Sequence, residues 1–268
     1  CAFARLAREC PQHKGTLAFL ITSDEEGDGD EGTKRVVEML EMRGVTIDAC
    51  IVGEPSCSKA FGDTIKNGRR GSLNGKVTVH GKAGHVAYPH LAKNPVHAAA
   101  PFLAELAGRT WDEGNAYFGA TTFQISNVNA GVGAVNVVPA ELTALFNLRF
   151  NTEWTAEGLI AEIEKTAAKH GLDASFEWKK SAQPFVTEPS AMTEILSSVI
   201  QEETGVTPAL STGGGTSDAR FICRITRETV EFGPINATIH SVNECVGLDE
   251  LEKLEVIYYR TAKAYLEK

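Results

Sequence analysis

The clearest alternation of apolar and polar residues lies in the middle of the chain. Leu142, Ala144, Phe146, Leu148 and Phe150 follow one another at every second position, which predicts a half-buried strand. Weaker alternation predicts three further strands, at 73–80, 121–128 and 174–178. Helical spacing predicts two helices, at 94–106 and 155–170. The resulting order is βαββαβ, which is that of a ferredoxin-like unit.

The flanking parts of the chain have a different pattern, with longer helices and short apolar strands. Apolar runs predict strands at 16–22 and 47–53, with a helix over 31–44 between them, as in a parallel βαβ unit. Further along, the pattern predicts a helix, a strand and an amphipathic terminal helix, at 191–204, 230–232 and 249–266.

Two short segments separate these patterns, the Gly-rich and basic residues 67–71 and the residues 181–186. We therefore predict one α/β domain that is interrupted by another. The domain boundaries expected are 1–70 for the first part of the outer domain, 71–184 for the inserted domain and 185–268 for the second part of the outer domain.

The amino-acid composition indicates which kinds of binding partner to expect. The 268 residues carry 26 Lys and Arg against 35 Asp and Glu, for a net charge of −9, so we expect no nucleic-acid partner. Apolar runs such as 17–21 are far shorter than the roughly 20 residues needed to span a bilayer, so we expect no membrane partner. Six cysteines without a C-x-x-C pair favour a reducing cytoplasm over a disulfide scaffold.

Carboxylates are unusually dense directly after the first predicted strand. Residues 22–31 contain six of them, and such density is self-repelling without a cation, although a solvated acidic turn is an open alternative. Glu54 follows the next strand, so both strand ends are expected to direct oxygen ligands into one crevice. An EF-hand is disfavoured, because the loop that begins at Asp24 has Arg35 at its twelfth position.

Other segments offer groups that bind carboxylates. The Gly-rich residues 211–218 lack the lysine of a P-loop, but their backbone N–H groups could hold a substrate carboxylate; a flexible turn is the alternative. Arg69, Arg70 and Arg149 are candidates because a guanidinium can donate to both oxygens of a carboxylate.

Five motifs occur along the chain in an order seen in one family: Ser-Asp-Glu-Glu-Gly, Gly-Glu-Pro-Ser, Gly-His-Val-Ala-Tyr-Pro, Gly-Gly-Thr-Ser-Asp-Ala-Arg and Asn-Ala-Thr-Ile-His-Ser-Val-Asn-Glu. Over essentially its whole length the chain resembles the aminoacylase and carboxypeptidase family of dinuclear zinc metallohydrolases. The resemblance implies a zinc-peptidase-like catalytic domain that is interrupted by a ferredoxin-like βαββαβ dimerisation, or lid, domain.

The same resemblance implies roles for the motif residues. Glu25 would be the general base, Glu26 and His240 ligands of one zinc, and Glu54 a ligand of the other. Two divalent ions, zinc or else cobalt, would polarise an amide carbonyl and acidify a water. In a homodimer, His85 and Asn136 would reach the active site of the partner subunit, where His85 would stabilise the oxyanion.

Within the family, the motifs are closest to the branch that releases succinate from N-succinyl-diaminopimelate in lysine biosynthesis. An N-succinyl amino-acid substrate is therefore expected, in a cytoplasmic enzyme. The residues implied for substrate binding are Arg69, Ser72, Tyr88, Asn136, Arg149, Thr216 and Asn236. A related deacylase, such as one for acetylornithine, an aminopeptidase-like hydrolase and a non-catalytic binding module with this fold are the alternatives.

One departure from the family pattern concerns its first metal ligands. The family's His-x-Asp motif, which supplies one histidine ligand and the bridging aspartate, does not occur in this chain, and the chain begins with Cys1 rather than Met. We therefore expect residue 1 to lie inside the catalytic domain, the dinuclear centre to be incomplete in these 268 residues, and the chain by itself to be inactive.

Overall fold

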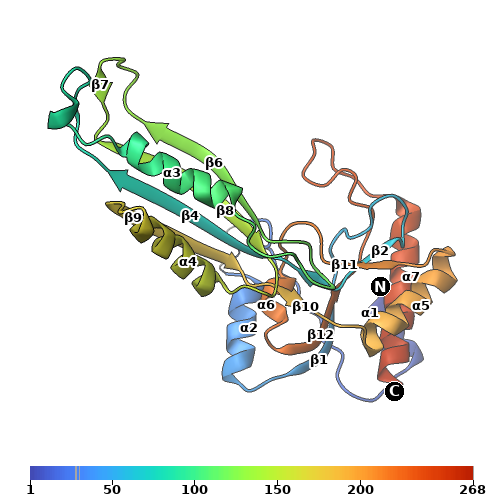
Figure 1. The fold of residues 1–268 in the computed structure, drawn as a ribbon. Helices are drawn as coiled ribbons and strands as arrows, with labels where there is room; N and C mark the ends of the chain where they lie inside the picture. The colour runs from blue at the N-terminus through green and yellow to red at the C-terminus, as the bar shows by residue number, and fades with distance from the viewer. Residues whose placement is uncertain (28, 30, 268) are drawn as a thin grey trace. The chain divides into compact units, whose positions relative to one another are not determined.

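A computed structural model describes residues 1–27, 29 and 31–267, and these form two compact units (Figure 1). Unit 1 comprises Cys1–Arg69 and Phe185–Lys268, and unit 2 comprises Arg70–Pro184. Within the described residues, no helix is both long enough and apolar enough to cross a bilayer.

Unit 2 is a four-stranded antiparallel sheet with two helices on one face (Figure 1). Its main elements follow the predicted order, which is confirmed: β4 (Gly71–His80), α3 (Pro95–Gly108), β6 (Thr122–Ala130), β8 (Glu141–Phe150), α4 (Ala156–Lys169) and β9 (Ala174–Ala182). The strands lie in the order β6-β8-β4-β9, so the first and third strands are central, as in a ferredoxin-like unit. A short ladder joins β5 (Gly84–His85) to β7 (Val137–Val138), and a 3-10 turn, η1, covers Pro89–Leu91.

The alternating residues of β8 form the core of unit 2 because every second side chain faces the helices. Phe146 packs with Phe102 of α3 and Leu159 of α4, and all three side chains are buried. Gly75 on β4 leaves room for this packing, since a Cβ atom there would lie 2.3 Å from the Phe146 ring.

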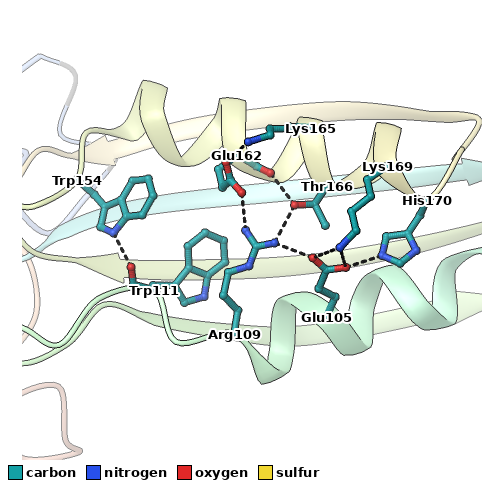
Figure 2. Close-up of polar contacts among 9 residues, drawn as sticks. All are labelled: Glu105, Arg109, Trp111, Trp154, Glu162, Lys165, Thr166, Lys169 and His170. Carbon is teal, nitrogen blue, oxygen red and sulfur yellow. Dashed lines mark hydrogen bonds and ion pairs between the residues drawn. The ribbon is translucent and has the colours of Figure 1, made fainter.

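A polar network joins the two helices of unit 2 (Figure 2). Arg109, which ends α3, donates to Glu162 and Thr166 of α4, each at 3.0 Å, and to Glu105 at 2.9 Å. Glu105 also accepts from Lys169 at 3.0 Å and contacts His170 at 2.7 Å. The hydrogen bonds from Lys169 and His170 lower the pKa of Glu105 to about 2, so the carboxylate is charged at neutral pH.

Unit 1 is built on a mixed sheet in the order β1 (Ile47–Val52), β12 (Thr226–Glu231), β2 (Thr64–Lys66) and β11 (Ala209–Ser211). The outer pairs are parallel, and β12 meets β2 antiparallel through Glu231 and Lys66. A second ladder pairs β3 (Gly68–Arg69) with β10 (Phe185–Val186).

Helices cover both faces of the unit 1 sheet, as is usual for sheets with parallel strand pairs. Residues of α5 (Ala191–Thr204) and α7 (Leu248–Leu266) pack with Ile65 and Val230 on one face. Val37 of α2 (Thr33–Met42) and Ile222 of α6 (Ala219–Ile222) pack with Cys50 and Val52 of β1 on the other. The helix α1 (Ala2–Glu9) packs against α7.

The predicted strand over 16–22 is wrong. The segment has no strand conformation, and its apolar side chains Phe19 and Ile21 are 74% and 75% exposed. A strand needs a neighbour for its backbone N–H and C=O groups, and none of the described strands pairs with these residues. The acidic residues that follow therefore do not extend from the end of a strand. The helix α1 and the short strands β2 and β11 were not predicted.

Candidate functional site

Glu54 lies two residues beyond the end of β1 and is half-buried. Burial, and to a smaller extent the nearby carboxylates of Glu25 and Glu231, raise its pKa to about 7. Glu25 lies in the turn before α2, where burial and the charge of Glu26 also raise its pKa. Glu25, Glu26 and Glu54 thus repel one another within unit 1, which favours a cation among them.

His240 and Glu26 form a second close pair in unit 1. The His240 Nδ1 atom lies 3.8 Å from the Glu26 Oε2 atom, and the two side chains are 68% and 76% exposed. His240 has a backbone φ of 56°, in the left-handed region that non-glycine residues seldom adopt. Thr238 closes this turn, because its hydroxyl accepts from the Cys245 N–H at 3.1 Å and donates to the Cys245 carbonyl at 2.9 Å.

The donor types at these positions fit a divalent metal ion. Carboxylates and an imidazole are ligands that zinc and cobalt accept, and the mutual repulsion around Glu54 would be offset by positive charge. Within the described part of the chain, however, no three His, Cys, Asp or Glu side chains form a preassembled metal-binding group. Asp28 and Asp30, which belong to the acidic motif, lie outside the described residues. The residues present therefore offer a ligand pair, Glu26 and His240, and a separate ligand, Glu54.

Arg69 is buried rather than presented as a free guanidinium. Its Nε atom donates to both carboxylate oxygens of Glu231, each at 3.0 Å, and its Nη2 atom also donates to Glu231. Its Nη1 atom donates to the Gly213 carbonyl at 3.0 Å. The sequence placed Arg69 among the substrate residues but did not single out Glu231, whose one signal was its position between two apolar residues, Val230 and Phe232.

The Gly-rich segment 211–218 lies against Arg69, and Thr216 within it accepts a hydrogen bond from Arg220 at 3.1 Å. The helix that follows, α6, has only four residues. Asn236 lines a shallow cavity of about 220 Å³ together with Pro55, Pro234 and Ile239. Thr216 and Asn236 thus belong to loops of unit 1, as do the candidate metal ligands.

Five of the expected site residues belong to unit 2, where they form two groups. The backbone of Val86 donates to the Asn136 carbonyl at 3.1 Å, and the rings of His85 and Tyr88 are 5.8 Å apart, so one group gathers around the β5–β7 ladder.

The other group is at the start of β4, where Ser72 pairs in register with Arg149 of β8. Burial and the charge of Arg70 lower the pKa of Arg149. About eight strand residues, roughly 25 Å, separate Ser72 from the far end of β4 near His85. The two groups therefore cannot contact one small ligand from the same copy of unit 2.

Known proteins resemble the chain in sequence over nearly its whole length. Residues 67–175 match a peptidase dimerisation domain. A succinyl-diaminopimelate desuccinylase from Pseudomonas fluorescens is 56% identical over 260 residues, which cover 97% of this chain and 68% of that protein. One from Bordetella avium is 57% identical over 256 residues, covering 96% and 68%.

Solved structures share the fold at low sequence identity. The aminopeptidase PepT from Bacillus cereus superposes with a TM-score of 0.76 at 21% identity, covering 100% of this chain and 68% of that one. A dinuclear metal-binding peptidase of the M20 family from Bacillus subtilis gives a TM-score of 0.69 at 18% identity, covering 99% and 69%.

Proposed function

The chain belongs to the succinyl-diaminopimelate desuccinylase family, and from this premise we propose that it acts in the hydrolysis of N-succinyl-LL-2,6-diaminopimelate to succinate and LL-2,6-diaminopimelate. The observation that carries the proposal is the 54–57% identity to four curated desuccinylases over 96–97% of the chain. The grouping of Glu25, Glu54 and the Glu26–His240 pair in unit 1 supports it chemically.

The proposed chemistry needs a base and divalent ions. Glu26 and His240 would hold one ion and Glu54 the other, with zinc the expected metal and cobalt an alternative. When bound, the ions supply Lewis acidity for the amide carbonyl and an acidified water. Glu25 accepts a proton from the attacking water as the new C–O bond forms, and delivers it to the nitrogen as the C–N bond breaks.

The substrate is held through its carboxylates in this proposal. Arg149 and Ser72 of unit 2, and Thr216 and Asn236 of unit 1, are the proposed contacts, with Arg69 contributing the N–H groups that Glu231 and Gly213 leave free. Burial and the charge of Arg70 lower the pKa of Arg149. A bound carboxylate would offset the repulsion between these two guanidinium groups.

We further propose that unit 2 dimerises and that His85, Tyr88 and Asn136 act in the partner's site. The strand β6 is an edge of its sheet, and the loop after it exposes Val132 and Val135 by 91% and 96%. Such apolar exposure beside an open edge is typical of an interface. His85 would then stabilise the oxyanion that develops on the amide. The place in lysine and diaminopimelate synthesis implies a cytoplasmic enzyme.

The test is succinate release from N-succinyl-LL-2,6-diaminopimelate by the complete product of the gene, after chelation and addition of zinc or cobalt. Glu25→Gln should reduce turnover by about 10²–10⁴-fold while the bound metal is unchanged. Glu31→Gln is the matched control, because Glu31 lies in the same acidic segment and its side chain is paired with the exposed Arg35. Release of acetate from N-acetylornithine without release of succinate would instead favour the related deacetylase. Bound metal without hydrolysis of either substrate would favour a binding module.

A further inference from the structure

Glu231 is a buried carboxylate that the proposed chemistry does not use. Its side chain lies at the end of β12 and the residue is 0% exposed. It is in register with Val52 of β1 on one side and with Lys66 of β2 on the other. The residue therefore stands where the parallel and antiparallel halves of the unit 1 sheet meet.

Donors from two distant segments converge on this carboxylate. Arg69 donates through Nε and Nη2, and the Ser217 hydroxyl donates to the Oε1 atom. Arg69 is 162 residues from Glu231 along the chain, whereas Ser217 is 14 residues away. A buried charge is tolerated only when it is paired and hydrogen-bonded, and Glu231 meets both conditions.

The opposite edge of the Arg69 guanidinium contacts the Gly-rich segment. Its Nη1 atom donates to the Gly213 carbonyl at 3.0 Å, and a Cβ atom on Gly214 would lie 2.5 Å from the same nitrogen. Glu231 therefore holds the segment 213–217 at two points, directly through Ser217 and indirectly through Arg69. Thr216 lies between these two points.

We propose that Glu231 is a positioning residue, which orients Arg69 and the segment 213–217 so that they receive a carboxylate of the substrate. The inference rests on the proposed function, in which Arg69 and Thr216 contact that carboxylate. A guanidinium is planar and has five N–H groups, so fixing one edge fixes the direction of the others. Three of the five are directed at Glu231 and Gly213, and in this proposal the remaining two donate to the ligand.

The test compares steady-state kinetics of the complete gene product and three variants. Ser217→Ala removes, without changing charge, the hydroxyl that donates to Glu231 and accepts from the Ala219 N–H at 3.3 Å. It should raise KM for the succinylated substrate about tenfold with kcat within about threefold. Glu231→Gln should raise KM further. Glu228→Gln is the matched control: Glu228 lies on the same strand but accepts from Ser190 and Met192 at the start of α5, so KM should not change.

Hydrogen exchange measured by mass spectrometry gives a readout that does not depend on turnover. Peptides covering residues 211–218 should exchange faster in Ser217→Ala and Glu231→Gln than in the parent protein, and at the parent rate in Glu228→Gln. If Glu231→Gln fails to fold, Ser217→Ala still tests whether Glu231 positions the Gly-rich segment.

Unchanged exchange and unchanged KM in Ser217→Ala would overturn the inference. So would a loss of stability and kcat in the Glu231 variant without a rise in KM, because that result would mean a purely structural role. A parent protein that hydrolyses no succinylated substrate would refute the proposed function, and the exchange data would still show whether Glu231 holds the Gly-rich segment.

Discussion

Replacing Gly214 with alanine is a direct test of the contact between Arg69 and the Gly-rich segment. The new Cβ atom would lie 2.5 Å from Arg69 Nη1, whereas ordinary contacts begin at 3.4 Å, so the nitrogen must move by about 0.9 Å. The end of an arginine side chain usually makes room at little cost. Here it cannot, because its other edge is bound to the buried Glu231.

Two costs add up in this variant. Gly214 has a φ of +103°, and a left-handed backbone costs an L-residue about 1–2 kcal/mol. Overpacking at a held group costs about 1–3 kcal/mol more. We expect a loss of about 2–5 kcal/mol in the free energy of unfolding of unit 1, or roughly 4–20 °C in Tm for a domain of this size class.

The assay is urea and thermal unfolding of Gly214→Ala beside Gly215→Ala. Gly215 is the matched control, because a Cβ atom there would meet nothing within 4 Å and its backbone is not left-handed. A difference between the two variants of no more than about 1–2 kcal/mol would refute the reasoning. The left-handed backbone alone would account for it, and Arg69 would then be free to swing away from Glu231.

Three further outcomes follow from the structure. Gly75→Ala should destabilise unit 2 by about 1–3 kcal/mol through its clash with the aromatic core, whereas Gly108→Ala, in open space within α3, should stabilise it by about 0.5–1 kcal/mol, as measured by chemical denaturation. Glu105 has a folded pKa of about 2, below its ordinary value of 4.5, so its stabilising contribution is present above about pH 4.5 and is lost as pH falls towards 2. The difference in Tm between the parent protein and Glu105→Gln should therefore shrink between pH 5 and pH 2, and a constant difference would contradict the assignment. Thr238→Val should speed hydrogen exchange at the Cys245 amide while Thr238→Ser does not, because only the hydroxyl closes that turn.

Local sequence patterns predicted the helices and strands whose own residues determine which side of the element is buried. The helix over 191–204 was predicted with the bounds that α5 has, since Ser190 caps its start and Gly205 ends it in a left-handed conformation. The order of elements in unit 2 followed from alternation on β8 and helical spacing elsewhere. The run over 16–22 has the same apolar character, but a strand also needs a neighbour, which no local pattern supplies.

The candidate site was only partly predictable for a similar reason. Glu25 and Glu54 stand out in the sequence because each is a carboxylate that follows an apolar segment. Glu231 does not, because its role depends on Arg69, 162 residues away, and a single carboxylate between apolar neighbours does not indicate its partner. The same long-range pairing explains why Arg69 looked like an open carboxylate-binding residue in the sequence and is held by Glu231 in the fold.

The most direct test of the proposed function is succinate release from N-succinyl-LL-2,6-diaminopimelate by the complete gene product supplied with zinc, measured beside Glu25→Gln. The account predicts metal-dependent release that falls by about 10²–10⁴-fold in the variant while metal content and Tm stay at the parent values. Release that is independent of metal, or that survives the loss of the Glu25 carboxylate, would contradict it.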